Sequence, residues 1–535
     1  MRRAAVVLAG LAAATVLASP AGAASGELSV QVADGANVAQ LERSVAAATG
    51  GRLVANLRAL DTLVFSVDEL EADSARAARL AGVRSVERLT ATRRLAFEPN
   101  DPLAPRQWYL DAIRAFDFWP ELPLQPPVRV AVVDSGVDGG HPELAGRIVG
   151  SRSFVSSPAL ADRIGHGTII AGQIAATLGN AQGTAGAGIP VELLVAKVVT
   201  SDGSISIVDE ASAIRWAVDS GAQVINLSLG GPRDPKHPRR DTYSPLEHSA
   251  IDYATRHGVI VVAAAGNCGS FSCPEHYASW PAALPHVIGV GALNQSNGTP
   301  DFSNRDRAFV DLAAPGVQIF STFPRGQSRT GCALRGYTSC ARELSARNPR
   351  GTSFSAPLVA AAAAVLIGER GRLALPALHS SQVAALVERS AKDIGVAGRD
   401  ARSGYGRLDV RAALEALGGP LPPPDAREPN DRLGANAAPL AKDVSVVDAT
   451  LDRFDDPRDV YRVGLTAGQR VVLSYAGPNA VLFLWRANGT LAAVSRTPGS
   501  TEQIAFRPAA SNKFFAEVRL PSGPGGGYRL TIQRG

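Results

Sequence analysis

Four residues that are far apart in the chain carry the side chains that hydrolysis of an amide bond requires. Asp134, His166, Asn267 and Ser353 follow one another in this order. Such a reaction needs a nucleophile, a base that takes its proton, a carboxylate that orients the base, and a donor for the oxyanion. One residue of each kind is present. The set therefore predicts a site for nucleophilic catalysis.

The elements that must position these residues alternate from about residue 127 onward between apolar runs and helical stretches. Nearly continuous runs of Val, Ile and Ala predict a mostly parallel sheet covered on both faces, a doubly wound α/β fold whose ligands lie at the carboxyl ends of the strands. The predicted strands are Val128–Val133, Val191–Val199, Ala222–Leu229, Val259–Ala265 and His286–Leu293, and the predicted helices are Gly167–Leu178, Ile207–Asp219 and Leu246–His257.

Each of the four residues stands at an end of one of these elements. Taken singly, each has a structural alternative: a satisfied buried carboxylate, a histidine packed at a helix start, or a serine that caps a helix. Ser353 precedes an Ala-rich helix, whose dipole favours negative charge near it. The ordered set, rather than any single member, favours catalysis.

The segments around these residues resemble those of the subtilisin-like serine proteases, the subtilases. The resemblance covers about residues 100–417 and implies that Ser353 is the nucleophile, His166 the general base and then acid, Asp134 the group that holds the imidazole, and Asn267 the oxyanion donor. The chain order also differs from chymotrypsin-like and α/β-hydrolase triads. The matching segments are VAVVDSGVDGGHPEL, GHGTIIAG, VINLSLGG, VVAAAGN, LAAPG, GTSFSAP and GYGRLDVRAAL.

The resemblance implies a serine endopeptidase that acts on protein or peptide substrates and needs no cofactor for catalysis. Two alternatives stay open: a catalytically silent protein that keeps the fold for binding, and a peptide ligase or esterase that uses the same triad. Removing any triad residue would leave only residual catalysis, and none is missing from this chain.

The resemblance also places the substrate. Ser228, Leu229 and Gly230 correspond to the edge strand whose backbone pairs with an extended peptide, so specificity must come from side-chain pockets. Ser279 lies near the floor of the main pocket and Cys268 near its rim. No acidic floor is evident, which predicts an apolar or broad preference.

Many subtilases bind structural calcium, and the resemblance implies that Asp101, Glu143 and Asn180 supply oxygen ligands. Glu143 stands where an aspartate is usual. The alternative is a set of solvated loop residues without an ion.

The N-terminus predicts export. Arg2 and Arg3 precede an apolar run from Ala4 to Ala18, and Pro20 and small residues follow, as in a secretory signal peptide. The run is shorter than a spanning helix requires, and no later segment reaches that length without a charge or turn signal. We therefore expect a secreted protein, extracellular or periplasmic, with no membrane domain. A retained N-terminal anchor is the alternative.

Export makes disulfides plausible, because they persist in oxidising compartments. The short separations among the four cysteines favour Cys268 with Cys273 and Cys332 with Cys340. Free thiols and metal binding are the alternatives, although no histidine stands at zinc spacing. The segment 323–350 is longer than in compact subtilases and carries the second pair. We expect it to shape the substrate cleft.

Two further domains flank the catalytic one. A βαββαβ pattern predicts a ferredoxin-like α+β unit, which resembles the inhibitory prodomain of the family and implies an intramolecular inhibitor that is cleaved off between about Thr90 and Asn100. The last part predicts a β-sandwich of six or seven short strands and, with Glu428–Asp431 (EPND), resembles the pre-peptidase C-terminal domain of secreted bacterial proteases. The expected parts are residues 1–24 (signal peptide), 25–98 (prodomain), 99–417 (peptidase domain), 418–427 (Pro-rich linker) and 428–535 (β-sandwich).

One group of acids within the predicted sandwich is a second candidate metal site. Asp455, Asp456 and Asp459 could bind an ion together, but a solvated charged turn is the favoured interpretation.

Composition agrees with an ordered, multidomain protein. At about 150 residues per domain, 535 residues correspond to three or four domains. A hydrophobic share of 45% and a charged share of 19% argue against disorder. The net charge is only +5, and no dense Lys/Arg run with interleaved aromatics occurs. Nucleic acid is therefore not expected as a partner.

Overall fold

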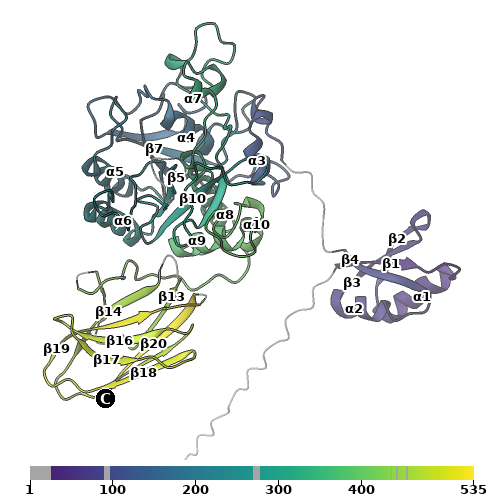
Figure 1. The fold of residues 1–535 in the computed structure, drawn as a ribbon. Coiled ribbons are helices and arrows are strands. Elements are labelled where there is room, and N and C mark those ends of the chain that lie inside the picture. The colour runs from purple at the N-terminus through teal and green to yellow at the C-terminus, as the bar shows by residue number, and fades with distance from the viewer. Residues whose placement is uncertain are drawn as a thin grey trace, which may run out of the picture. The chain divides into compact units, whose positions relative to one another are not determined.

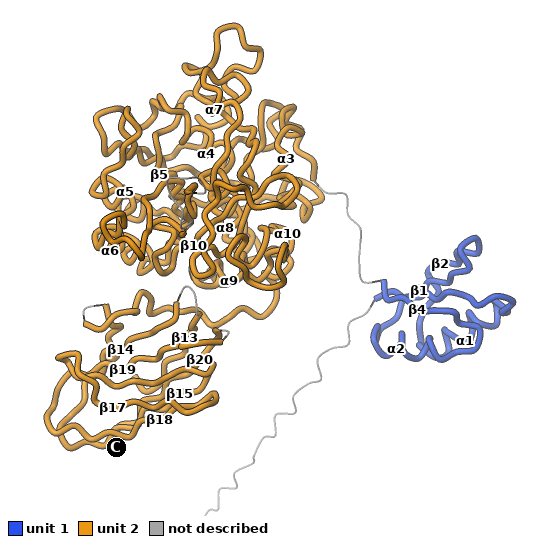
Figure 2. The backbone as a smooth tube through the Cα atoms, in the orientation of Figure 1, with its two compact units in different colours: residues 1–94 blue, residues 95–535 orange. Residues whose placement is uncertain are grey.

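The computed structural model describes residues 26–89, 97–268, 277–434, 436–441, 444–452, 456–523 and 525–535. Within it the chain forms two compact units, residues 1–94 and residues 95–535 (Figure 2). The predicted signal peptide, Cys273, Asp455 and most of the expected maturation region lie outside the described residues.

The first unit is a four-stranded antiparallel sheet with two helices, in the predicted βαββαβ order. Its strand order is β2-β3-β1-β4. Leu28 and Phe65 of the sheet are buried together with Leu41 of the first helix. This helix begins after Asn37, whose side chain accepts a hydrogen bond from the main-chain N–H of Gln40. The elements are β1 (Gly26–Val32), α1 (Val38–Thr49), β2 (Arg52–Leu57), β3 (Thr62–Val67), α2 (Leu70–Ala77) and β4 (Val83–Leu89).

The second unit contains a seven-stranded sheet in which every neighbouring pair is parallel, in the order β11-β10-β9-β8-β5-β7-β6 (Figure 1). This confirms the doubly wound α/β fold. The sequence did not predict β6 and β11, because β6 alternates between half-exposed and exposed residues and β11 is very short. The strands are β5 (Val128–Asp134), β6 (Ile148–Ser153), β7 (Val191–Lys197), β8 (Val224–Leu227), β9 (Ile260–Ala264), β10 (Val287–Leu293) and β11 (Leu312–Pro315).

Helices cover both faces of this sheet. Val130 and Val132 of β5 pack in one core with α4 and α8, whereas Ala131 and Val133 pack in another with α5 and α6. A strand that is buried on both sides reads as a continuous apolar run, which is why the sequence identified it. The helices are α3 (Trp108–Ala112), α4 (His166–Ala175), α5 (Ile207–Asp219), α6 (Pro245–Arg256), α7 (Leu344–Arg347), α8 (Ala356–Arg372), α9 (Ser380–Arg389) and α10 (Val410–Ala416).

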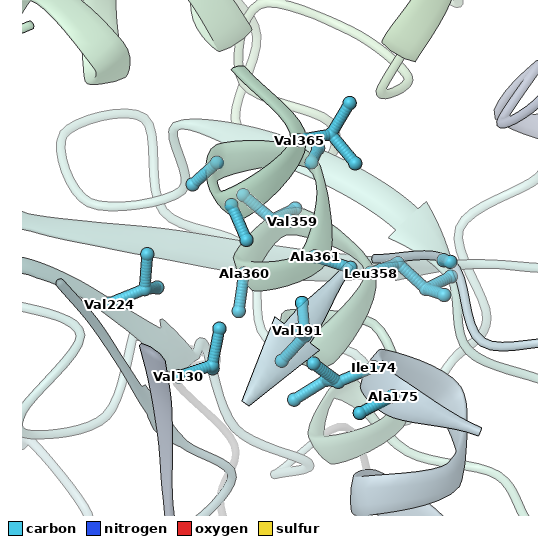
Figure 3. Packing of buried hydrophobic residues seen from close by; sticks show 14 of the residues in the cluster. Val130, Ile174, Ala175, Val191, Val224, Leu358, Val359, Ala360, Ala361 and Val365 are labelled. Atoms are coloured by element: carbon cyan, nitrogen blue, oxygen red, sulfur yellow. The ribbon is translucent and has the colours of Figure 1, made fainter. Parts of the chain in front are cut away.

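Helix α8 lies in the centre of the first core. Ala360 and Ala361 are buried in one core with Val130 and Val224 of the sheet, and Ala360 is directed toward these strands (Figure 3). Side chains this small let the helix lie close to the strands. In the described part of the chain, Thr352–Arg372 is the one helix long and apolar enough to cross a membrane, and 89% of its apolar window is buried inside the protein.

The segment 323–350 carries short helical turns and the disulfide Cys332–Cys340, which confirms that pairing. Cys268 is also disulfide-bonded, while Cys273, its expected partner, lies outside the described residues. The turns are η3 (Arg325–Gln327) and η4 (Thr338–Cys340), and α7 follows them.

The C-terminal strands form two sheets that enclose one apolar core, which confirms the β-sandwich. Their orders are β12-β14-β19-β16-β17 and β13-β20-β15-β18. The described residues hold more strands than predicted, because β17 and β18 bury at most one face and mix polar with apolar residues. The strands are β12 (Ala438–Pro439), β13 (Val446–Leu451), β14 (Arg458–Leu465), β15 (Val471–Ala476), β16 (Val481–Arg486), β17 (Leu491–Ser495), β18 (Thr501–Phe506), β19 (Asn512–Arg519) and β20 (Gly526–Arg534).

Candidate active site

Asp134 and His166 form a hydrogen-bonded pair at the carboxyl end of the parallel sheet. Asp134 is the last residue of β5 and is buried, and His166 is the first residue of α4. Nδ1 of His166 lies 2.9 Å from both carboxylate oxygens of Asp134. Because Nδ1 donates to Asp134, Nε2 is left to accept a proton.

The environment of His166 sets its proton affinity. Burial alone would lower the pKa of His166, but the charge of Asp134 and the hydrogen bond to it raise this pKa above its ordinary value, and the charge of Asp162 adds to the rise. The imidazole keeps 29% of its surface exposed, so a substrate can still reach it.

Asp162 is a buried acid that the sequence analysis missed. It accepts hydrogen bonds from Ser135 Oγ (3.0 Å), Gly165 N (2.8 Å) and Ile164 N (3.0 Å). The main-chain N–H and the hydroxyl of Thr168 donate to its other oxygen at 3.0 and 2.6 Å. Asp162 thereby fixes the loop that presents His166. An acid shortly before GHGT was the available signal in the sequence.

Gly165 needs to be a glycine for two reasons. Its φ is +96°, a left-handed conformation that other residues rarely adopt. A Cβ atom at this position would also lie 2.3 Å from the ring of Phe323. The segment that begins at Phe323 therefore packs directly against the loop that carries His166.

Ser353 lies in the helical turn η5 (Thr352–Phe354), directly before α8. Its main-chain oxygen accepts a hydrogen bond from Ser228 Oγ at 2.7 Å. Ser228 Oγ in turn accepts one from Asn226 Nδ2 at 2.9 Å. These bonds tie the turn that carries Ser353 to the end of β8.

The side-chain amide of Asn267 has a defined orientation. Its Oδ1 accepts hydrogen bonds from the main-chain N–H of Thr352 at 2.8 Å and from the Thr352 hydroxyl at 3.1 Å. The same hydroxyl accepts a bond from Gly266 N at 3.0 Å. With Oδ1 occupied in this way, Nδ2 is the group of Asn267 that remains to serve a ligand.

The sequence-predicted residues line one cleft of about 470 Å³. Asp134 is the only acid among its described lining residues, and it is engaged with His166. The sequence analysis did not identify three further apolar residues of the wall, Ile164, Val199 and Ile205. The cleft brings together the four predicted catalytic residues and the predicted substrate-binding residues Ser228, Leu229, Gly230 and Ser279.

Comparison with known protein families matches residues 126–406, just over half of the chain, to the Subtilase family. The chain belongs to the subtilase family. It is a serine endopeptidase of the subtilisin type, and as such it acts on protein or peptide substrates.

Two relatives with more than 30% identity agree with this assignment. Subtilisin DY from Bacillus licheniformis is 36% identical over 289 residues, which cover 54% of this chain and 91% of that protein. Thermitase from Thermoactinomyces vulgaris is 34% identical over 304 residues, which cover 56% of this chain and 94% of that protein. A crystal structure of a lanthipeptide protease aligns with 60% of this chain and 99% of its own at 27% identity and a TM-score of 0.49.

The residues predicted to bind calcium in this subtilase do come together. Asp101 accepts hydrogen bonds from Gly179 N at 2.8 Å and from Asn180 N at 3.2 Å, one on each carboxylate oxygen. Glu143 accepts one from Asn180 Nδ2 at 3.3 Å on Oε2 and one from the Tyr337 hydroxyl at 3.0 Å on Oε1. Every carboxylate oxygen of the pair thus has a donor from the protein. Asn180, the third predicted ligand, presents its N–H group to Glu143 while its oxygen accepts from Gln182 N, so these three residues do not form the all-oxygen set that calcium requires.

A different acid cluster, which we call the sandwich acid cluster, consists of Asp425, Glu428, Asp456 and Asp459. One carboxylate oxygen of each lies within 4.8 Å of the others, and all four residues are buried. The charged turn that contains Asp456 and Asp459 was expected to be solvated, which is wrong. The carboxylates lie between the linker and the start of β14, where the packed chain covers them.

Three oxygens of the sandwich acid cluster, Oδ1 of Asp425, Asp456 and Asp459, are buried without a hydrogen-bond partner among the described residues. Burial and the neighbouring charges raise the pKa of Asp425 to about 7, and they also raise the pKa values of Asp456 and Asp459 well above their ordinary range. A cavity of about 290 Å³ reaches the cluster. Four carboxylates, three of them with an oxygen that lacks a hydrogen-bond partner among the described residues, lie beside this cavity and could hold a hard cation such as calcium.

The cluster also adjoins the parallel-sheet part of the second unit. Nε2 of His286, next to β10, lies 3.0 Å from Glu428 and 3.2 Å from Asp431. Asn430 donates to both oxygens of Glu428, at 2.9 and 2.7 Å. The EPND segment therefore contacts the sheet domain through its acids and orders Glu428 through its asparagine.

Proposed function

We propose that this subtilase is an exported endopeptidase that cleaves peptide bonds with Ser353 as nucleophile, His166 as base and Asp134 as its orienting carboxylate. The observation that carries the proposal is the two-oxygen contact between Asp134 and Nδ1 of His166, in the same cleft as Ser353 and Asn267. This contact selects the one tautomer of His166 that can take a proton at Nε2.

In the first step Ser353 Oγ attacks the scissile carbonyl carbon while its proton passes to Nε2 of His166. The carbonyl oxygen takes the displaced electron pair and becomes an oxyanion. His166 then gives the proton to the leaving amine nitrogen as the C–N bond breaks, which leaves an acyl ester on Ser353. Water hydrolyses this ester with His166 again as base, and Asp134 stays ionised throughout.

Asn267 serves the oxyanion. Because Thr352 occupies Oδ1 with two hydrogen bonds, Nδ2 is held ready as a donor without rearrangement. A donor fixed in advance stabilises charge as it develops. In subtilisin, removal of one such donor costs about 2.7 to 4 kcal/mol of transition-state stabilisation. We expect Asn267→Ala to fold normally and to lose about 10²- to 10³-fold in kcat.

The substrate is an extended peptide with neutral or apolar side chains near the cut. Backbone pairing with residues 228–230 gives affinity without sequence preference. The described cleft wall presents Ile164, Val199 and Ile205 and no acid other than Asp134. This supports an apolar or broad preference over a basic one.

The N-terminal unit acts, in this proposal, as an intramolecular inhibitor of a zymogen that is exported to the extracellular space or the periplasm. The apolar N-terminal run and the compact βαββαβ unit that follows it support this role. Loss of residues 1–24 and then of the unit up to about residue 98 would release the active enzyme.

Labelling with a fluorophosphonate tests the catalytic proposal. The mature protein should take up the label, and Ser353→Ala should not. A folded mature protein that refuses the label would indicate the catalytically silent alternative. Product analysis on casein and on small esters separates an endopeptidase from a peptide ligase or esterase.

We also propose that the sandwich acid cluster binds structural calcium. The supporting observation is the set of three buried carboxylate oxygens without a partner in the described part of the chain. Calcium should raise the melting temperature of the Ser353→Ala protein, and Asp456→Asn should abolish that rise. An unchanged response in Asp456→Asn would place the effect elsewhere.

A further inference from the structure

The place where the family resemblance predicts calcium is filled by hydrogen bonds of the protein itself. Asp101 and Glu143, which we call the loop acid pair, are each 1% exposed. Their four carboxylate oxygens are occupied by Gly179, Asn180 and Tyr337 at 2.8 to 3.3 Å. The pair thus differs from a cation site, whose oxygens converge on one free point.

The amide of Asn180 directs its nitrogen, not its oxygen, toward the loop acid pair. Its Oδ1 accepts a hydrogen bond from Gln182 N at 2.8 Å, which fixes the orientation of the amide. Nδ2 therefore faces Glu143 and donates to it at 3.3 Å. A nitrogen donor in this direction repels a cation rather than binding it.

Tyr337 comes from the segment 323–350 and lies between the two cysteines of its disulfide. Its hydroxyl donates to Glu143 Oε1. The neighbouring Gly336 places its carbonyl oxygen 2.7 Å from Nε2 of His141, and the rings of His141 and Tyr337 meet edge to face at 5.6 Å. The tyrosine is therefore held by packing as well as by its hydrogen bond.

The backbone at Gly183 lies directly against this hydrogen bond. A Cβ atom on Gly183 would lie 1.9 Å from Glu143 Oε1 and 1.9 Å from the Tyr337 hydroxyl. The loop backbone thus packs directly on the bonded pair. Thr184 Oγ1 is buried without a partner in the described part of the chain, but one neutral hydroxyl does not supply a coordination shell.

We infer that the hydroxyl of Tyr337, carried by the disulfide-bonded segment 323–350, replaces calcium at the loop acid pair, so that this subtilase holds the loop around Asn180 without a metal at that place. The glutamate at position 143 suits this arrangement, because its longer side chain reaches the tyrosine from the neighbouring loop. The main-chain oxygen of Glu143 also accepts bonds from N and Oγ1 of Thr177, both at 3.1 Å. Since Thr177 follows α4, the same residue steadies the helix that begins at His166.

Direct calcium binding tests the inference. The full chain carrying Ser353→Ala, which cannot digest itself, is titrated with calcium by isothermal calorimetry, and the titration is repeated with Glu143→Gln added. We expect the same number of bound calcium ions in both proteins. Loss of one calcium ion in the Glu143→Gln protein would overturn the inference.

The matched control is Asp456→Asn in the same background, which changes a carboxylate of the sandwich acid cluster to an amide. If calcium is bound and only Asp456→Asn removes it, the inference is supported. If the Ser353→Ala protein binds no calcium, with or without either added substitution, the absence of a metal at the loop acid pair is supported, and only the proposal for the sandwich acid cluster fails.

Tyr337→Phe gives a second measurement, which does not depend on how Glu143→Gln folds. We expect the melting temperature of the Ser353→Ala protein to fall by about 2 to 8 °C with calcium and equally with EDTA. Tyr253→Phe, which removes a hydroxyl bound to Asp219 near the surface, should change it by less than about 2 °C. A melting temperature for Tyr337→Phe that matches the parent, or that calcium restores, would contradict the inference.

Discussion

Asp162 and the loop acid pair, which surround the parallel sheet of the peptidase domain, contrast with the sandwich acid cluster, which is formed by residues between 425 and 459. Asp162 accepts five hydrogen bonds from its own loop and from Ser135. The sandwich acid cluster has three oxygens with no donor among the described residues. All these acids are buried, so burial by itself does not distinguish them.

The difference lies in the supply of donors. Loops in the peptidase domain turn N–H and O–H groups toward each carboxylate. These donors satisfy the buried oxygens, so no ion is needed. In the sandwich acid cluster four acids face one another, and only a proton or a cation can offset their mutual repulsion. We therefore expect the two regions to respond to different perturbations: the first to loss of a donor, the second to loss of an ion.

The largest expected effect is that of removing the Asp134 carboxylate, and it tests whether a calcium ion can replace this charge. Asp134→Asn should lower kcat by on the order of 10⁴-fold, because an amide no longer holds the tautomer of His166 or stabilises its charged form. Assays of purified mature enzyme on a peptide substrate, with and without calcium, would measure this. If calcium restored the activity of Asp134→Asn, an ion would be replacing the carboxylate, and the contrast between the two regions would fail.

Removal of calcium is the next largest perturbation, and we expect it to act only on the C-terminal domain. If free calcium is about 1,000-fold above its Kd, chelation lowers the free energy of unfolding by about 4 kcal/mol. Calorimetric melting of the Ser353→Ala protein, with domain-specific proteolysis, would locate the loss. EDTA-induced cleavage within residues 177–183 would contradict the assignment of roles to the two regions.

Tyr337→Phe should have a smaller effect, confined to the peptidase domain. It leaves one buried oxygen of Glu143 without its donor, which costs about 1 to 3 kcal/mol of unfolding free energy. Denaturant unfolding of the Ser353→Ala protein measures the loss. A cost well below 1 kcal/mol would mean that the loop acid pair does not depend on this donor.

The smallest expected effect is on pH dependence. Asp134 raises the pKa of His166 above its ordinary value of about 6.5, and the base must be neutral to act, so kcat/KM should rise with pH through a value above 6.5. The residual activity of Asp134→Asn should rise at a lower pH. If calcium shifts the pH profile of the wild-type enzyme, the ion acts on the active site as well, which contradicts the separate roles expected for the two regions.

The fold, and the meeting of the four proposed catalytic residues in one cleft, were predictable for a physical reason. A strand that is buried on both faces leaves a continuous apolar run, and the residue that ends it, as Asp134 does, lies at the functional edge of the sheet. The Ala-rich run after Ser353 placed this residue at the start of a helix, and the ordered set and the family resemblance supplied its proposed role. Such signals are local in sequence.

The missed features depend on contacts between distant segments. Tyr337 meets Glu143 across 194 positions of the chain. His286 meets Glu428 from another part of the same unit. Nothing near either residue in the sequence indicates its partner. For the same reason the turn at Asp456 was wrongly predicted to be solvated, because the segments that bury it lie elsewhere.

The alanines of α8 have one more consequence. They set the thickness of the layer between the helix and strands β5 and β8; Ser353 lies in the turn just before this helix, and Asp134 ends β5. A single bulkier residue in place of Ala360 would lift the helix and carry the serine away from the imidazole. The position of Ser353 relative to His166 and Asp134 thus depends on a row of methyl groups that takes no part in the proposed chemistry.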